Sequence, residues 1–205
     1  MFSDSLNLFS HLTWPKIQNV VEVYSSYHYS RIRKTPVIKG LPLSISIEPT
    51  TSCNLRCPEC PSGLRSFTRP TGMLDPMLFR SIIDQLSETL CYLTFYFQGE
   101  PYLHPSFLQM AEDASRRGIY TATSTNAHFL NEEMARRTVE SGLDKLIVSV
   151  DGTTQESYEA YRAGGKLSKV MEGAENILYW KRKLRSRTPY VVFQFLVVKH
   201  NQHQI

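Results

Sequence analysis

Three cysteines lie within eight positions of the chain, in the segment SCNLRCPEC at residues 52–60. Cys53, Cys57 and Cys60 form a C-x3-C-x2-C spacing, and the sequence has one other cysteine, Cys91. A loop with this spacing can wrap a compact metal cluster, and iron–sulfur cubanes take thiolate ligands, usually four. Three thiolates would hold three irons and leave the fourth iron open to a ligand from outside the protein.

Zinc is the competing metal, because thiolates bind it as well. A Cys3His zinc site needs a histidine as its fourth ligand, and His104 and His128 are the candidates near predicted strand ends. Neither lies at a zinc-finger spacing from the cysteines, so both metals, and three ordinary thiols, stay open at this point. Cys91 precedes a predicted strand, and we expect it to be a small buried hydrophobe rather than a ligand.

Apolar, strand-like stretches alternate with helical patterns along most of the chain. Strict alternation is typical of a parallel sheet made of right-handed βα units. We therefore expect an α/β fold, either an open doubly wound sheet or a partial (β/α) barrel. Strands are predicted at residues 43–50, 92–98, 119–126, 145–152 and 190–198. Helices are predicted at residues 75–90, with Asp75 as N-cap, at 105–118, at 131–142, with Asn131 as N-cap, and at 154–162 and 168–186.

The N-terminal part lies outside this alternation. A helix is predicted at residues 13–30, with Thr13 as N-cap and Pro15 in its first turn, and the linker KTPVIKGLP follows it. We divide the chain into an N-terminal helical extension with its linker, residues 1–40, and a core domain, residues 41–205.

Polar residues gather where the predicted strands end. The cysteine segment follows the first strand, Gly99 and Glu100 follow the second, Asn126 ends the third, and Ser149 and Asp151 end the fourth. Parallel α/β folds place their functional sites at the carboxyl ends of the strands. These side chains are therefore expected to meet at one rim of the sheet.

Composition and charge argue against several classes of function. The chain has 205 residues and a formal net charge of only +4, much of it in KRKLRSR at the end of a predicted helix, where cations complement the helix dipole. No segment approaches the roughly 18 apolar residues of a membrane span, and the N-terminus lacks the features of a secretory signal. We expect no nucleic-acid or membrane partner, and a reducing, cytoplasmic compartment.

The cysteine segment and four further motifs together resemble the radical S-adenosylmethionine (radical SAM) enzymes. In order, the motifs are CNLRCPEC, FQGEP, TSTN, SVDG and YRAGG, and the resemblance covers about residues 43–198. It implies a partial (β/α) barrel with a [4Fe–4S] cluster on the three cysteines and S-adenosylmethionine at the open iron. It also implies reductive cleavage to a 5′-deoxyadenosyl radical that abstracts hydrogen from a substrate, with an external flavodoxin- or ferredoxin-like electron donor.

The resemblance assigns a role to the segment after the second strand. Gly99 and Glu100 correspond to a GGEP stretch that meets the methionyl amino group, and a carboxylate suits an ammonium partner. Gln98 stands where the family pattern usually has a glycine.

Further contacts are implied on the later strands. Ser149 and Asp151 would approach the ribose or the methionyl carboxylate, with Asn126 nearby, and Arg162 would bind the carboxylate. Each also has a structural explanation: Asp151 as part of a turn, Asn126 as a left-handed residue, and Arg162 as a surface helix residue. Gln194 is either a cofactor contact or a core amide.

The family core has six βα units, whereas five strands are predicted here and the sequence stops at KHNQHQI. We therefore expect a truncated chain, an incomplete barrel and an exposed edge on the fifth strand. The alternatives to a radical SAM enzyme are a non-catalytic iron–sulfur or zinc module and an inactive fragment. The substrate stays open between a peptide, a lipid and a small metabolite.

Overall fold

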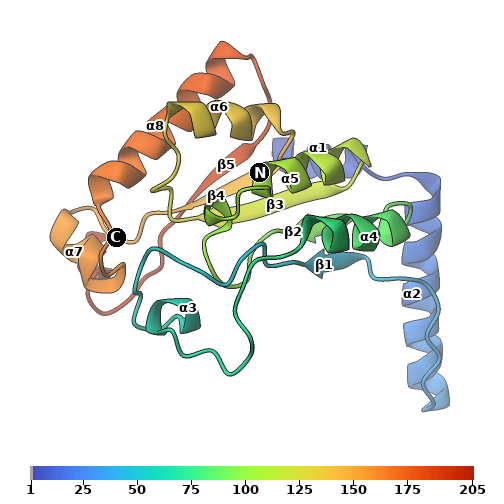
Figure 1. The fold of residues 1–205 in the computed structure, drawn as a ribbon. Coiled ribbons are helices and arrows are strands. Elements are labelled where there is room, and N and C mark those ends of the chain that lie inside the picture. The colour runs from blue at the N-terminus through green and yellow to red at the C-terminus, as the bar shows by residue number, and fades with distance from the viewer. Residues whose placement is uncertain (1) are drawn as a thin grey trace.

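The computed structural model describes residues 2–205, with one sheet of five parallel strands at its centre (Figure 1). Each strand pairs with the next strand in the sequence, so the order is β1-β2-β3-β4-β5. A doubly wound sheet reverses its order at a switch point, and this sheet has no reversal. The predicted α/β partial barrel is therefore confirmed. The strands are β1 (Ser44–Ser46), β2 (Tyr92–Thr94), β3 (Tyr120–Thr125), β4 (Lys145–Ser149) and β5 (Tyr190–Gln194).

Helices connect the strands in the expected alternation (Figure 1). Two of them begin at predicted caps: the Asp75 carboxylate accepts a hydrogen bond from the Met77 N–H, and the Asn131 side chain accepts one from the Met134 N–H. Short helices after β1 and β2 and near the C-terminus were not predicted. The helical segments of the core are α3 (Pro61–Leu64), α4 (Pro76–Leu86), η1 (Pro101–Leu103), α5 (Phe107–Arg116), α6 (Glu132–Glu140), α7 (Gln155–Tyr161), α8 (Leu167–Lys183) and η2 (Gln202–Gln204).

The strands are shorter than the apolar stretches that predicted them. The stretch 43–50 is a strand only over β1, and 190–198 only over β5. Past β5 the chain leaves the ladder, and the Leu196 N–H donates to the Asp151 carboxylate instead of to a neighbouring strand. The predicted end of the fifth strand was wrong because polar side chains take over the backbone hydrogen bonds there, and Asn201 likewise accepts from the Val198 N–H.

An aromatic cluster supports the carboxyl end of β2. Phe95 follows β2 and packs against Phe79 of α4 and Phe107 of α5, each with ring centroids 5.6 Å apart. Tyr102 of η1 lies 5.0 Å from Phe107. All four rings belong to the buried core, and burying each contributes about 1.5–3 kcal/mol. The packing of these rings therefore fixes the backbone that leads from β2 into the segment beginning at Gly99.

The N-terminal extension is attached at the amino ends of the strands, opposite the aromatic cluster. It forms α1 (Phe2–Ser10), which was not predicted, and α2 (Trp14–Arg33), which covers the expected helix. Asp144, just before β4, accepts hydrogen bonds from the side chains of Asn7 (2.7 Å) and His11 (3.1 Å). Lys16 is 1% exposed, and its ammonium donates to the carbonyl of Gly118, just before β3. The boundary at residue 40 stays a prediction.

β5 forms the outer edge of the sheet, and exposed apolar side chains lie on it and just past it. Phe193 in β5 is 53% exposed, and Val197, three residues past the strand, is 52% exposed. Within residues 2–205, no strand pairs with this edge. In the same range, no helix combines the length and the apolar character that crossing a membrane requires.

Candidate functional site

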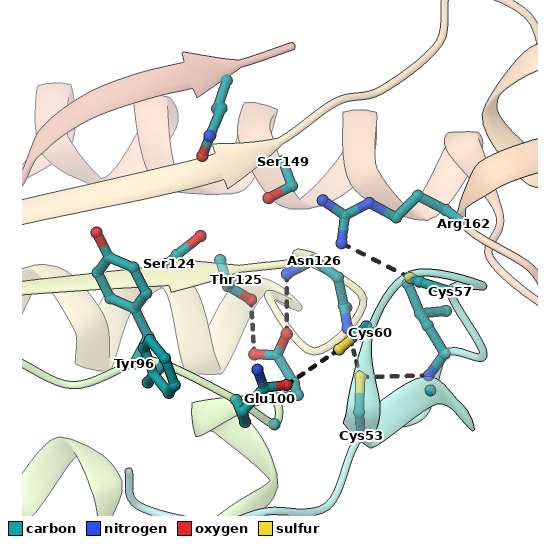
Figure 2. A pocket seen from close by; sticks show the side chains of 16 residues that line it. Cys53, Cys57, Cys60, Tyr96, Glu100, Ser124, Thr125, Asn126, Ser149 and Arg162 are labelled. Atoms are coloured by element: carbon teal, nitrogen blue, oxygen red, sulfur yellow. Dashed lines mark hydrogen bonds between the residues drawn. The ribbon is translucent and has the colours of Figure 1, made fainter. Parts of the chain in front are cut away.

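A cavity of about 200 Å³ opens at the carboxyl ends of the strands (Figure 2). It is lined from the loops after β1 and β2, from the ends of β3, β4 and β5, and from the residue after α7. The structure thus brings together elements that are far apart in the sequence. Nine of the predicted site residues line the cavity: Cys53, Cys57, Cys60, Gly99, Glu100, Asn126, Ser149, Arg162 and Gln194.

The cysteine loop is held by its own backbone. Cys57 is buried, while Cys53 and Cys60 are half-buried. The Arg56 N–H donates to the Ala163 carbonyl at 2.9 Å, which ties the loop to the YRAGG segment. α3 begins directly after Cys60, and a Cβ at Gly63 would lie 2.5 Å from the Cys57 backbone, so only glycine allows this packing.

Burial makes the thiols weak acids. It raises the pKa of Cys53 to about 11 and also raises the pKa of Cys57, where the neighbouring Arg162 charge acts in the opposite direction. A metal must therefore displace protons when it binds. Arg162 can compensate part of the negative charge that develops on Cys57.

The thiols fit a cluster better than a single ion. Among residues 2–205, no three His, Cys, Asp or Glu side chains converge closely enough to share one metal ion. In a cubane each thiolate binds its own iron, so such convergence is not required. Cys91 is half-buried rather than buried as expected, and it does not line the cavity.

Neither candidate histidine supplies a fourth zinc ligand. The His104 Nε2 lies 2.8 Å from the Leu74 carbonyl oxygen, and its Nδ1 accepts from the Ser106 N–H. The His128 Nδ1 lies 2.9 Å from the Asn126 carbonyl oxygen, and its Nε2 accepts from the Lys166 N–H. All four ring nitrogens are thus engaged with the backbone, so the donor set does not suit a Cys3His site.

Glu100 presents a buried carboxylate to the cavity. It is 2% exposed and accepts hydrogen bonds from the Thr125 hydroxyl (2.7 Å), the Asn126 N–H (2.8 Å) and the Tyr102 N–H (3.3 Å). Figure 2 shows the first two. Burial raises the pKa of Glu100 to about 7, although the three hydrogen bonds favour the charged form. A carboxylate accepts about four hydrogen bonds, so one acceptor position is left for a ligand.

Gly99 lets the β2 loop touch the β1 loop. Its φ is +79°, and a Cβ there would lie 2.0 Å from the Thr50 carbonyl oxygen. Its N–H donates to the Ser62 hydroxyl at 2.9 Å, and the Glu100 N–H donates to the Ser52 carbonyl at 2.8 Å. Glycine is therefore required for contact between the cysteine loop and the acidic loop.

Asn126 contacts the cysteine loop from β3. Its Nδ2 donates to the Asn54 Oδ1 at 2.8 Å and lies 3.9 Å from the Cys53 sulfur. The left-handed conformation that was considered for Asn126 belongs to the next residue, Ala127, with φ +63°. Asn126 thus connects the third strand to the first cysteine.

Asp151 lies behind the cavity rather than in its wall. Its side chain is fully buried, and its carboxylate accepts from the Arg162 Nε at 2.5 Å and from the Leu196 N–H at 2.7 Å. Asp151 therefore faces Arg162, which lines the cavity, and its predicted contact with the cofactor stays a prediction. The Arg162 side chain is 21% exposed and not a surface residue, and its NH1 lies 3.9 Å from the Cys57 sulfur (Figure 2).

Ser149 and Gln194 lie opposite one another on β4 and β5. Both line the cavity, and Gln194 is exposed, so the core-amide explanation for it is wrong.

Sequence reasoning missed part of the cavity wall. Thr125 binds Glu100, and Gln98 lies 3.3 Å from Cys60. Tyr96 and Phe97, which directly precede QGEP in the sequence, also line the cavity, and their position beside this motif could have indicated that they do. Ser124 near the end of β3 also lines the cavity.

A parallel partial barrel with three cysteines and a buried acid at its carboxyl rim is the architecture of a radical SAM core. The model of the Radical SAM superfamily matches residues 47–178 of this sequence. The chain belongs to this superfamily, whose members use a [4Fe–4S] cluster and S-adenosylmethionine.

Relatives of the chain are considerably longer proteins. Over 136 residues it is 30% identical to mycofactocin maturase MftC of Mycobacterium ulcerans, covering 66% of this chain and 36% of that protein. Over 162 residues it is 28% identical to the tungsten-containing aldehyde ferredoxin oxidoreductase cofactor-modifying protein of Pyrococcus furiosus, covering 78% and 45%. The chain therefore spans less than half the length of either relative.

Solved structures share the fold. Streptococcus suis SuiB bound to S-adenosylmethionine matches with a TM-score of 0.65 and 16% identity, over 87% of this chain and 39% of that one. Native anSMEcpe with bound AdoMet matches with a TM-score of 0.61 and 24% identity, over 75% and 43%.

Proposed function

We propose that this chain is the catalytic core of a radical SAM enzyme. Cys53, Cys57 and Cys60 would hold the [4Fe–4S] cluster, and the adjoining cavity would take S-adenosylmethionine. Bound there, the cluster and S-adenosylmethionine supply a 5′-deoxyadenosyl radical for hydrogen abstraction from a substrate. The observation that carries this proposal is the convergence of three thiols and one buried carboxylate on a single cavity.

The protein's own groups suit the two ends of a methionyl moiety. Glu100 has one acceptor position left for an ammonium group, and Gly99 keeps the acidic loop against the cysteine loop. Arg162 is held by Asp151 and offers its remaining N–H groups to a carboxylate. Asn126, Ser149 and Gln194 line the rest of the cavity and would contact the sugar or the base.

We infer that the electron comes from an external flavodoxin- or ferredoxin-like donor in a reducing compartment. The substrate does not follow from similarity. The relatives include a PqqA peptide cyclase, an AdoMet-dependent heme synthase and a 2-deoxy-scyllo-inosamine dehydrogenase. Their substrates differ in kind, so a peptide, a lipid and a small metabolite all remain candidates.

Anaerobic reconstitution tests the proposal. The protein should hold about four irons and four sulfides, and its reduced EPR signal should change when S-adenosylmethionine is added. Reduction should then release 5′-deoxyadenosine. Cys57→Ala should lose the cluster, whereas the control Cys91→Ala should keep it, because Cys91 does not line the cavity.

Three results would contradict the proposal. One zinc without sulfide would indicate a zinc module. A cluster whose signal ignores S-adenosylmethionine would indicate an electron carrier. Binding of S-adenosylmethionine without cleavage under reduction would argue against catalysis by this chain.

A further inference from the structure

Gln98 is a half-buried side chain in the wall of the cavity, next to a proposed cluster ligand. Its Oε1 lies 3.3 Å from the Cys60 sulfur and 3.5 Å from the Ser62 hydroxyl oxygen. The glycine usual at this position in the family pattern offers no side-chain polar group. Gln98 therefore adds a polar contact to Cys60 that such a pattern lacks.

The contact must change when Cys60 binds a metal. A thiol can donate to the Gln98 oxygen, but a metal-bound thiolate has no proton and can only accept. An amide oxygen facing an anionic sulfur is unfavourable. A half-turn of the terminal amide exchanges its oxygen and its NH2 group without any other movement.

The surroundings suit the turned amide. An NH2 group has two N–H donors, and two acceptors lie beside it. One is the Cys60 sulfur. The other is the Ser62 hydroxyl, which accepts from the Gly99 N–H at 2.9 Å and donates to the Gln98 Oε1 at 3.5 Å. When the amide turns, the hydroxyl proton leaves this long contact, and the second acceptor position of the hydroxyl oxygen takes a Gln98 N–H. Ser62 is buried at the start of α3, so it holds the amide in place.

We propose that Gln98 donates an N–H···S hydrogen bond to the Cys60 thiolate and thereby raises the reduction potential of the cluster. The inference rests on the proposed function. Reduction adds one electron, and the added negative charge spreads onto the sulfurs. A donor to a sulfur stabilises the reduced form more than the oxidised form, and such hydrogen bonds are known to set cluster potentials.

Potentiometric titration of the reconstituted protein, followed by EPR without S-adenosylmethionine, tests the inference. Gln98→Met keeps the length and removes the donor. It should shift the one-electron equilibrium roughly tenfold toward the oxidised cluster, which corresponds to about 59 mV. Gln98→Glu should lower the potential further, because it places a carboxylate beside the sulfur. Gln109→Met, on the exposed side of α5, makes the same chemical change away from the cavity and should leave the potential unchanged.

A second measurement reports on the hydrogen bond itself. Electron–nuclear double resonance in H2O and D2O should show an exchangeable proton coupled to the wild-type cluster, and Gln98→Met should lose this coupling. An unchanged potential in Gln98→Met would overturn the inference. So would loss of the cluster from Gln98→Met but not from Gln109→Met, because Gln98 would then act in assembly. A wild-type protein without any cluster would instead overturn the proposed function.

Discussion

The Nε of Arg162 donates to the buried carboxylate of Asp151 at 2.5 Å, and this pair holds the guanidinium 3.9 Å from the Cys57 sulfur. The two charged residues are 11 positions apart, whereas Arg162 and Cys57 are 105 positions apart. Asp151 is thus a positioning residue that acts on the cavity through Arg162.

Asp151→Asn should weaken both folding and ligand binding. Removing one partner from a buried ion pair leaves the other charge uncompensated, which costs about 3–5 kcal/mol. We expect a loss of this order in the free energy of unfolding, and roughly tenfold weaker binding of S-adenosylmethionine because Arg162 is no longer held. Chemical denaturation and equilibrium binding measure the two effects.

The matched control is the more exposed pair Arg69–Glu48, in which the Arg69 side chain is 46% exposed. Glu48→Gln should cost no more than about 1 kcal/mol, because solvent screens such pairs. If Asp151→Asn and Glu48→Gln lost the same free energy of unfolding, the stabilising role of the buried Asp151–Arg162 pair would be contradicted.

Glu100 should make the binding of S-adenosylmethionine depend on pH. Its pKa is raised to about 7 by burial, so below pH 7 the carboxyl group is protonated and cannot pair with an ammonium. Affinity should rise as the pH passes through 7. Glu100→Gln should bind about 10–100-fold more weakly at pH 8, as expected for a lost charged hydrogen bond.

The free amino group of S-adenosylmethionine titrates near pH 8. Its effect on the pH dependence of the affinity is the same for the wild type and for Glu100→Gln. Only the wild type should therefore show the additional step near pH 7. Parallel pH profiles for the wild type and Glu100→Gln would rule out a pairing between Glu100 and the amino group.

Gly99→Ala should destabilise the protein more than another left-handed glycine does. The φ of +79° costs an alanine about 1–2 kcal/mol. In addition, the Cβ would lie 2.0 Å from the Thr50 carbonyl oxygen, so the backbone must move. Gly118→Ala has φ +69° and no atom within 4 Å of the added Cβ, and it should show only the conformational cost. Thermal unfolding of both variants makes the comparison, and similar midpoints would contradict the close contact.

His11 should stabilise the attachment of the N-terminal helices at low pH. Hydrogen bonding to Asp144 raises the pKa of His11 above its ordinary value of 6.5. A raised histidine pKa gives a contribution that is fully present below pH 6.5 and declines as the pH rises through the raised value. His11→Gln should therefore cost roughly 1 kcal/mol at pH 5.5 and less at pH 9. Denaturation at the two pH values tests this, and the difference should vanish in an Asp144→Asn background.

Local patterns predicted the elements well where a single side chain decides them. Asp75 and Asn131 were predicted as caps, and both accept the expected backbone hydrogen bonds. α1 and the short helix α3 were missed because neither carries a long periodic pattern. The strand ends were set too far along the chain, since apolar alternation continues where the backbone already leaves the sheet.

The sequence by itself determined the order of the units and indicated the proposed cluster ligands. The C-x3-C-x2-C spacing and Glu100 in QGEP are each contained in a short segment, so they can be recognised without the fold. The alternation of strands and helices implies that the carboxyl ends of the strands share one rim. Only the tertiary structure decided which side chains meet there. At the rim it placed Asp151 against Arg162 and Gln98 beside Cys60, and at the opposite end of the sheet it placed Asp144 against His11. Such pairings join residues up to 133 positions apart, and they depend on packing that no local period encodes.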